Sequence, residues 1–109
     1  NCLDAQSINE MYPSLAAFTR TSAPASLAIP LQALWWLKKG GLVMGPEWQK
    51  AHELCQTKEG EHDHDLVHAL AHWIEGDMGN ASYWYRRIGE TRAADIETEW
   101  TRIAVALSK

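Results

Sequence analysis

The stretch from His68 to Gly89 constrains the fold of this chain more than any other segment, because it predicts two short helices joined by a tight turn. The first helix is expected to end at Gly76, the residue type that most often ends a helix in the left-handed conformation. Asp77 or Asn80 can accept a hydrogen bond from the free backbone amides that begin the second helix. Helices joined by so short a turn pack as an antiparallel pair.

The rest of the chain shows further helical apolar stripes separated by loop-forming residues. Helices are expected within residues 7–20, from Leu27 or Pro30 to Lys39, from Pro46 to about Thr57, from Asp63 or Asp65 to about Glu75, from about Asn80 to Ile88, and within residues 91–109. In the last of these, Asp95, Glu99 and Arg102 are expected to point away from the apolar stripe. No segment has the period-2 alternation of a strand. The sequence therefore predicts a single all-α domain, 1–109, with five or six helices.

Composition, net charge and cysteine spacing indicate which partners and which cellular location to expect. The chain is 46% apolar and has six tryptophans, which predicts a folded core, and its net charge of −4 argues against nucleic acid and anionic membranes as partners. Cys2 and Cys55 have no spacing typical of a disulfide framework or a zinc knuckle, so a reducing cytoplasm is the expected location. The chain begins at Asn1, so removal of an N-terminal leader stays an open alternative.

A weak internal repeat relates two of the expected helices. A shift of 30 residues superposes residues 48–56 on 78–86, and each copy follows a helix that ends at glycine. Gly76, Ala81, Tyr85 and Ile88 resemble the small and aromatic positions at which the two helices of a tetratricopeptide repeat cross. This resemblance implies two antiparallel helical hairpins, with the N- and C-terminal helices as caps because two repeats do not form a stable solenoid alone.

A narrower resemblance is carried by the motif EGDxxNAxYWYRR, here Glu75 to Arg87. Together with Trp35-Trp36, the WxxAHE segment that starts at Trp48, and a closing Glu99-Trp100, it is similar to a family of small bacterial all-helical proteins. The resemblance implies a fold and a set of positions, and no activity.

Histidines recur on one side of the helix that precedes Gly76. His64, His68 and His72 are spaced by four residues and Glu75 follows, opposite the apolar face on a helical projection, so these side chains are expected to point away from the core. One interpretation is a solvated polar face. Another is a metal site, since His68 and His72 at this spacing can share an ion, with Glu75 as third ligand or general base and His52 or Glu53 completing the set. A third is an organic or peptide ligand.

Two further histidine and arginine groups have weaker interpretations. His62 and His64 lie in an expected acidic loop, where they either bind a divalent metal adventitiously or are simply solvated. Tyr83 and Arg87 are spaced to bind a carboxylate or phosphate together. The competing interpretation is that the adjacent arginines complement the helix dipole and pair with Glu90.

Neighbouring tryptophans in the first hairpin cannot both point inward. Trp35 and Trp36 differ by about 100° around a helix, so one is expected at a groove, at a subunit contact, or under the loop that follows.

These patterns support three hypotheses of function. The leading one is a non-enzymatic module, without a cofactor, that binds a protein partner or a small acidic ligand through the set His52, His68, His72, Glu75, Tyr83 and Arg87. The alternative is a metal-dependent hydrolase that uses a divalent ion at His68, His72 and Glu75, with His52. The third is a structural homodimer with a tryptophan at the contact.

Overall fold

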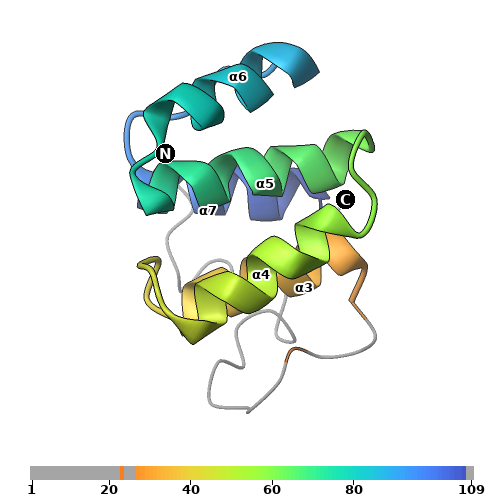
Figure 1. Ribbon diagram of the computed structural model, residues 1–109, viewed down its shortest axis with the longest axis vertical. Coiled ribbons are helices and arrows are strands. Elements are labelled where there is room, and N and C mark those ends of the chain that lie inside the picture. The colour runs from red at the N-terminus through yellow and green to blue at the C-terminus, as the bar shows by residue number, and fades with distance from the viewer. Residues whose placement is uncertain (1–22, 24–26, 108–109) are drawn as a thin grey trace.

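The computed structural model describes residue 23 and residues 27–107 (Figure 1). In this part of the chain the structure has five α-helices and no strand: α3 (Ile29–Lys39), α4 (Pro46–Gln56), α5 (His62–Glu75), α6 (Met78–Ile88) and α7 (Ile96–Leu107). The prediction of an all-α fold with five helices is confirmed. The helix expected within residues 7–20, and Cys2, lie outside the described residues. Among the described helices, none has both the length and the apolarity needed to cross a membrane.

Local sequence signals explain where the second hairpin turns. Gly76 and Gly89 end α5 and α6 with φ angles of 88° and 72°, which a residue with a side chain adopts only at a cost. Asp77 begins α6, and its carboxylate accepts a hydrogen bond of 3.2 Å from the backbone N–H of Asn80. The predicted ends and cap of this hairpin are confirmed.

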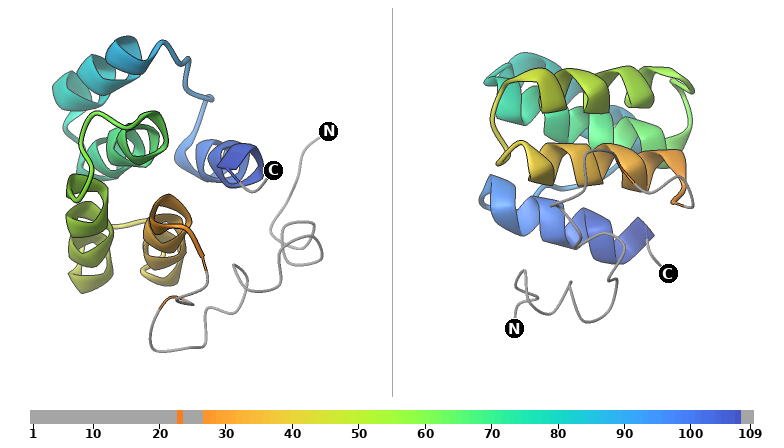
Figure 2. Two further views of the ribbon diagram at one scale, coloured as in Figure 1. Left: turned by 90° about the vertical axis from the view of Figure 1, so that its right-hand side faces the viewer. Right: turned by 90° about the horizontal axis from the view of Figure 1, so that it is seen from below.

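Helix α5 is the centre of the fold. It contacts α3, α4, α6 and α7, while α3 pairs with α4 and α6 packs mainly against α5 (Figures 1 and 2). The residues from His64 to Ala71 are consequently all buried. The chain thus forms two helical hairpins, α3–α4 and α5–α6, with α7 packed against α3 and α5.

Two buried indole groups tie neighbouring helices together. The Nε1–H of Trp48 on α4 donates to the carbonyl of Ala71 on α5 at 2.9 Å, and that of Trp100 on α7 donates to the carbonyl of Leu34 on α3, also at 2.9 Å. Each indole buries a large apolar area and still satisfies its one polar atom. These bonds fix how α4 sits on α5 and how α7 sits on α3.

The prediction that only one of Trp35 and Trp36 points into the core is confirmed. Trp35 is fully buried, whereas Trp36 is half-buried and packs edge-on against it, with ring centroids 5.0 Å apart. Lys50 on α4 places its ammonium 5.4 Å from the centre of the Trp36 ring. The homodimer hypothesis stays a prediction.

Two predictions about α5 are wrong. The helix begins at His62, so His62 and His64 belong to its first turns and not to a flexible loop. The histidine face does not point to solvent, since His64 and His68 are each only 3% exposed. The helical projection assumed one apolar face, but neighbouring helices surround α5. His64 Nδ1 lies 2.8 Å from a Glu61 carboxylate oxygen.

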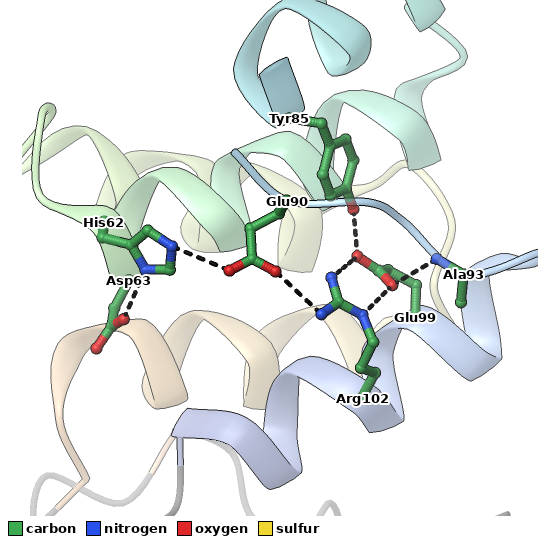
Figure 3. A network of polar contacts seen from close by, with 7 residues as sticks. All are labelled: His62, Asp63, Tyr85, Glu90, Ala93, Glu99 and Arg102. Atoms are coloured by element: carbon green, nitrogen blue, oxygen red, sulfur yellow. Dashed lines mark hydrogen bonds and ion pairs between the residues drawn. The ribbon is translucent and has the colours of Figure 1, made fainter. Parts of the chain in front are cut away.

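Glu99 was also expected to face solvent, and it is completely buried. Figure 3 shows why this charge is tolerated: its carboxylate accepts hydrogen bonds from the hydroxyl of Tyr85 at 2.7 Å, from the backbone N–H of Ala93 at 2.8 Å, and from two guanidinium nitrogens of Arg102 at 2.8 and 2.9 Å. Arg102 also donates to Glu90 at 3.1 Å. This network, which joins α6 to α7, satisfies the buried carboxylate fully.

Candidate metal centre

Three imidazole rings from two helices converge on one point. His68 and His72 lie one turn apart on α5, and His52 reaches them from α4. The Nε2 atom of His68 is 3.2 Å from Nε2 of His52 and 3.1 Å from Nε2 of His72. Ring nitrogens of all three lie within 4.8 Å of one another. We call His52, His68 and His72 the three-histidine cluster.

Aromatic neighbours hold two of these rings in place. The Trp48 indole, one turn before His52 on α4, stacks on that imidazole with centroids 4.8 Å apart and planes 10° from parallel. Trp84 on α6 stacks on His68 with centroids 4.8 Å apart and an angle of 30°. Large rings packed flat against an imidazole restrict its rotation, so both Nε2 atoms are held toward the cluster.

A carboxylate orients the third ring. Nδ1 of His72 lies 2.8 Å from Oε1 of Glu75. Since a carboxylate only accepts hydrogen bonds, Nδ1 of His72 carries the proton and donates it to Glu75. The lone pair of the neutral ring then lies on Nε2, which faces the other two imidazoles. This is the arrangement in which metal-binding histidines are usually held.

Burial favours the neutral form of two rings of the cluster, His52 and His68. Burial, together with the neighbouring His72 and His52, lowers the pKa of His68 to about 4. Burial also lowers the pKa of His52, with a further contribution from His72. Neutral rings have lone pairs that can bind a cation, whereas imidazolium rings do not.

Hydrogen bonds alone cannot satisfy the three facing nitrogens. Nε2 of His68 has either one N–H or one lone pair, so it can form a hydrogen bond with His52 or with His72 but not a good one with both. Nδ1 of His68 is buried and has no hydrogen-bond partner among residues 27–107. A cation at the centre would use the lone pairs of all three Nε2 atoms at once.

The spacing of the nitrogens fits a metal ion. At a Zn–N bond length of about 2.0–2.1 Å, two ligands of a tetrahedral ion are about 3.3–3.4 Å apart. The distances of 3.1 and 3.2 Å found here are close to that value without rearrangement of the helices.

The electrostatic surroundings of the cluster are negative. The carboxylates of Glu75, Glu59 and Glu53 are near enough to His52 to act on its pKa, each in the direction that favours positive charge. The carboxylate of Asp77 is near enough to His72 for this ring to contribute to lowering the pKa of Asp77. Such a field attracts cations to the cluster and disfavours anions.

The six residues predicted as one binding set form two groups. His52, His68 and His72 come together, and Glu75 contacts the outer nitrogen of His72, which makes it a supporting group instead of a third ligand on the same point. Glu53, the alternative to His52, is exposed and accepts a hydrogen bond of 3.4 Å from Gln49.

Tyr83 and Arg87 form the second group, on the outer surface of α6. Tyr83 is 47% exposed, and its hydroxyl accepts a hydrogen bond of 3.3 Å from Arg87. The Arg87 guanidinium lies 5.0 Å from the centre of the Trp84 ring, and His68 stacks on the same ring. The Trp84 ring therefore contacts both Arg87 and one member of the cluster. Glu90, expected to pair with Arg86 or Arg87, contacts Arg102 and His62.

Sequence reasoning missed the two tryptophans that support the cluster. Trp48 precedes His52 by four residues, a spacing that places both on one face of α4, so it was detectable in principle. The contact of Trp84 with His68 depends on how α6 crosses α5, and no local pattern encodes it.

Comparison with protein-family models, with curated proteins and with solved structures finds no significant match for this chain. The resemblance to tetratricopeptide repeats, and to a family of small bacterial helical proteins, therefore stays a prediction.

Proposed function

We propose that this protein binds a divalent transition-metal ion through Nε2 of His52, His68 and His72. The observation that carries the proposal is the pair of Nε2–Nε2 distances, 3.1 and 3.2 Å, between buried or half-buried imidazole rings. The hydrogen bond from His72 to Glu75 and the two stacked tryptophans support it, because they aim the rings before any ion arrives.

The chemistry of the donors selects the class of ion. Three imidazoles suit Zn²⁺, Cu²⁺, Ni²⁺ or Co²⁺, whereas Mg²⁺ and Ca²⁺ prefer oxygen ligands. We take Zn²⁺ as the reference ion because it accepts three imidazoles in a tetrahedral site without a further protein ligand.

An equilibrium measurement with metal-free, untagged protein tests the proposal. Titration with Zn²⁺ in a calorimeter is expected to give one site per chain, and His52→Ala, His68→Ala and His72→Ala are each expected to weaken binding by at least about 100-fold, as loss of one of three ligands should. Circular dichroism checks that each variant keeps its helices.

The matched control is His62→Ala, which removes an imidazole from α5 outside the cluster. His62 is exposed and contacts Asp63 and Glu90 instead. Its loss should leave the zinc affinity within about twofold of the wild type, since surface ion pairs have small effects. Equal losses of affinity in His62→Ala and His72→Ala, or no site in the wild type, would refute the proposal.

The hypothesis that the same cluster binds a small acidic ligand is less well supported. The carboxylates around His52 oppose an anion there. A protein partner for the exposed pair Tyr83 and Arg87 stays a prediction of the sequence.

A further inference from the structure

The three-histidine cluster leaves part of a bound ion uncovered by protein. Among residues 27–107, the donor atoms that meet at this point come only from His52, His68 and His72. Glu75 meets Nδ1 of His72, on the side of the ring away from the cluster. A tetrahedral ion bound by three protein ligands takes its fourth ligand from solvent, which is the arrangement of catalytic zinc sites.

The uncovered side of the ion faces solvent. His68 is the most buried of the three rings, while His52 and His72 are both partly exposed at the edge between α4 and α5. Glu75, beside His72, is exposed as well. An incoming molecule can therefore approach between His52 and His72, while His68 lies beneath the ion.

The ligand set keeps the full charge of the ion. Three neutral imidazoles contribute no negative charge, so a divalent ion retains its +2 charge at the position where water binds. An ion of this kind lowers the pKa of its bound water from 15.7 to about 7 and supplies hydroxide near neutral pH.

From this geometry we infer that the metal-loaded protein hydrolyses uncharged carboxylic esters, an activity that rests on the proposed function. The metal-bound hydroxide oxygen bonds to the ester carbonyl carbon, and the bond from that carbon to the alkoxy oxygen breaks. The departing alkoxide takes up the proton, so one ester and one water give one carboxylic acid and one alcohol.

The charge of the substrate follows from the surroundings of the cluster. Glu53, Glu59 and Glu75 are near enough to His52 to act on its pKa, and Asp77 is near His72, so four carboxylates lie near the cluster. The four carboxylates carry more negative charge than the two positive charges of the ion, so their field disfavours an ester with a second, distant carboxylate.

The test compares two esters with the same leaving group and acyl chain length, para-nitrophenyl hexanoate and the para-nitrophenyl monoester of adipic acid, on zinc-loaded and metal-free protein. Zinc is expected to raise kcat/KM for the hexanoate at least about tenfold, because only the loaded protein has hydroxide at neutral pH. The adipate monoester is expected to react at least about threefold more slowly. His62→Ala should match the wild type, and His68→Ala should behave as the metal-free protein does.

Zinc content is measured on the same samples, so the two proposals can fail separately. A sample with one zinc per chain that hydrolyses hexanoate no faster than metal-free protein would overturn the esterase inference and leave metal binding intact. Equal or faster reaction of the adipate monoester would overturn the substrate class. A protein that takes up no zinc would overturn the proposed function, and the esterase with it.

Discussion

Each imidazole of the three-histidine cluster is oriented by a different neighbour. Trp48 stacks on His52, Trp84 stacks on His68, and Glu75 accepts the Nδ1 proton of His72. Only the last of these contacts is a hydrogen bond, so only for His72 does a single atom decide which ring nitrogen has the lone pair. Glu75 should therefore affect metal affinity without touching the ion.

We expect Glu75→Gln to weaken zinc binding about tenfold. Loss of a carboxylate that holds a metal-binding histidine in place typically lowers metal affinity by roughly 10- to 100-fold. Competition with a chromophoric chelator measures the change. Glu53→Gln is the matched control, since it removes the same charge near His52 without a contact to a cluster ring. Similar losses in both variants would mean that Glu75 acts through its charge alone.

The hairpin α5–α6 brings Trp84 over His68. The turn between its two helices depends on a glycine in the left-handed backbone conformation. Gly76 has a φ of 88° and ends α5 directly after Glu75. Gly79, three residues later, lies in α6 with open space around its position for a methyl group, the nearest atom being Asp77 Oδ1 at 3.7 Å. The two glycines therefore have opposite roles, although they are close in the sequence.

We expect Gly76→Ala to lower the free energy of unfolding by about 1 kcal/mol, since the left-handed conformation costs an L-residue about that much. Gly79→Ala should raise it by up to about 1 kcal/mol, because alanine is the better helix former. Urea unfolding followed by circular dichroism measures both. Loss of stability in Gly79→Ala, or none in Gly76→Ala, would contradict this account of the turn.

At the scale of the whole molecule, α7 is held to the rest by a buried charge. Burial by itself raises the pKa of Glu99, but hydrogen bonds from Arg102, Tyr85 and the Ala93 N–H outweigh that effect and hold the pKa below the ordinary value of 4.5. A carboxyl group whose pKa is lower in the folded state stabilises the fold above its unfolded pKa. That contribution is lost as the pH falls through the folded pKa.

We therefore expect the free energy of unfolding to fall more steeply between about pH 5 and pH 3 in the wild type than in Glu99→Gln, which has no carboxyl to protonate at this position. Denaturant unfolding at several pH values measures the slopes. Glu97→Gln, at an exposed position in the first turn of α7, is expected to follow the wild type. Equal slopes in Glu99→Gln and Glu97→Gln would show that Glu99 does not contribute to acid unfolding.

Short-range sequence patterns predicted the helices of this fold but did not predict which of their side chains are buried. Glycine, proline and the Asp77 cap located most helix ends, because those effects act within one turn of the chain, but the start of α5 at His62 was missed. Burial depends on contacts between helices, and a projection with one apolar face could not anticipate that α5 has neighbours on several sides. His68 and Glu99 were assigned to solvent for that reason and are buried.

The candidate site was predictable to a similar extent. The spacing of His68 and His72 encodes their proximity, and His52 was among the residues named to join them. The role of Glu75 could not be assigned, because a helical spacing brings a carboxylate near a histidine without deciding whether it faces the ion or the outer nitrogen. Tyr83 and Arg87 were grouped with the histidines because the sequence does not show that these two side chains contact each other instead of the cluster.

X-ray absorption spectroscopy of the zinc-loaded protein counts the imidazoles bound to the ion. We predict three imidazole nitrogens at about 2.0–2.1 Å and one further light-atom ligand from solvent. His72→Ala should show fewer imidazoles at any zinc it retains, and His62→Ala should give the wild-type spectrum. A wild-type spectrum with one imidazole or none, or with a sulfur ligand, would contradict the account.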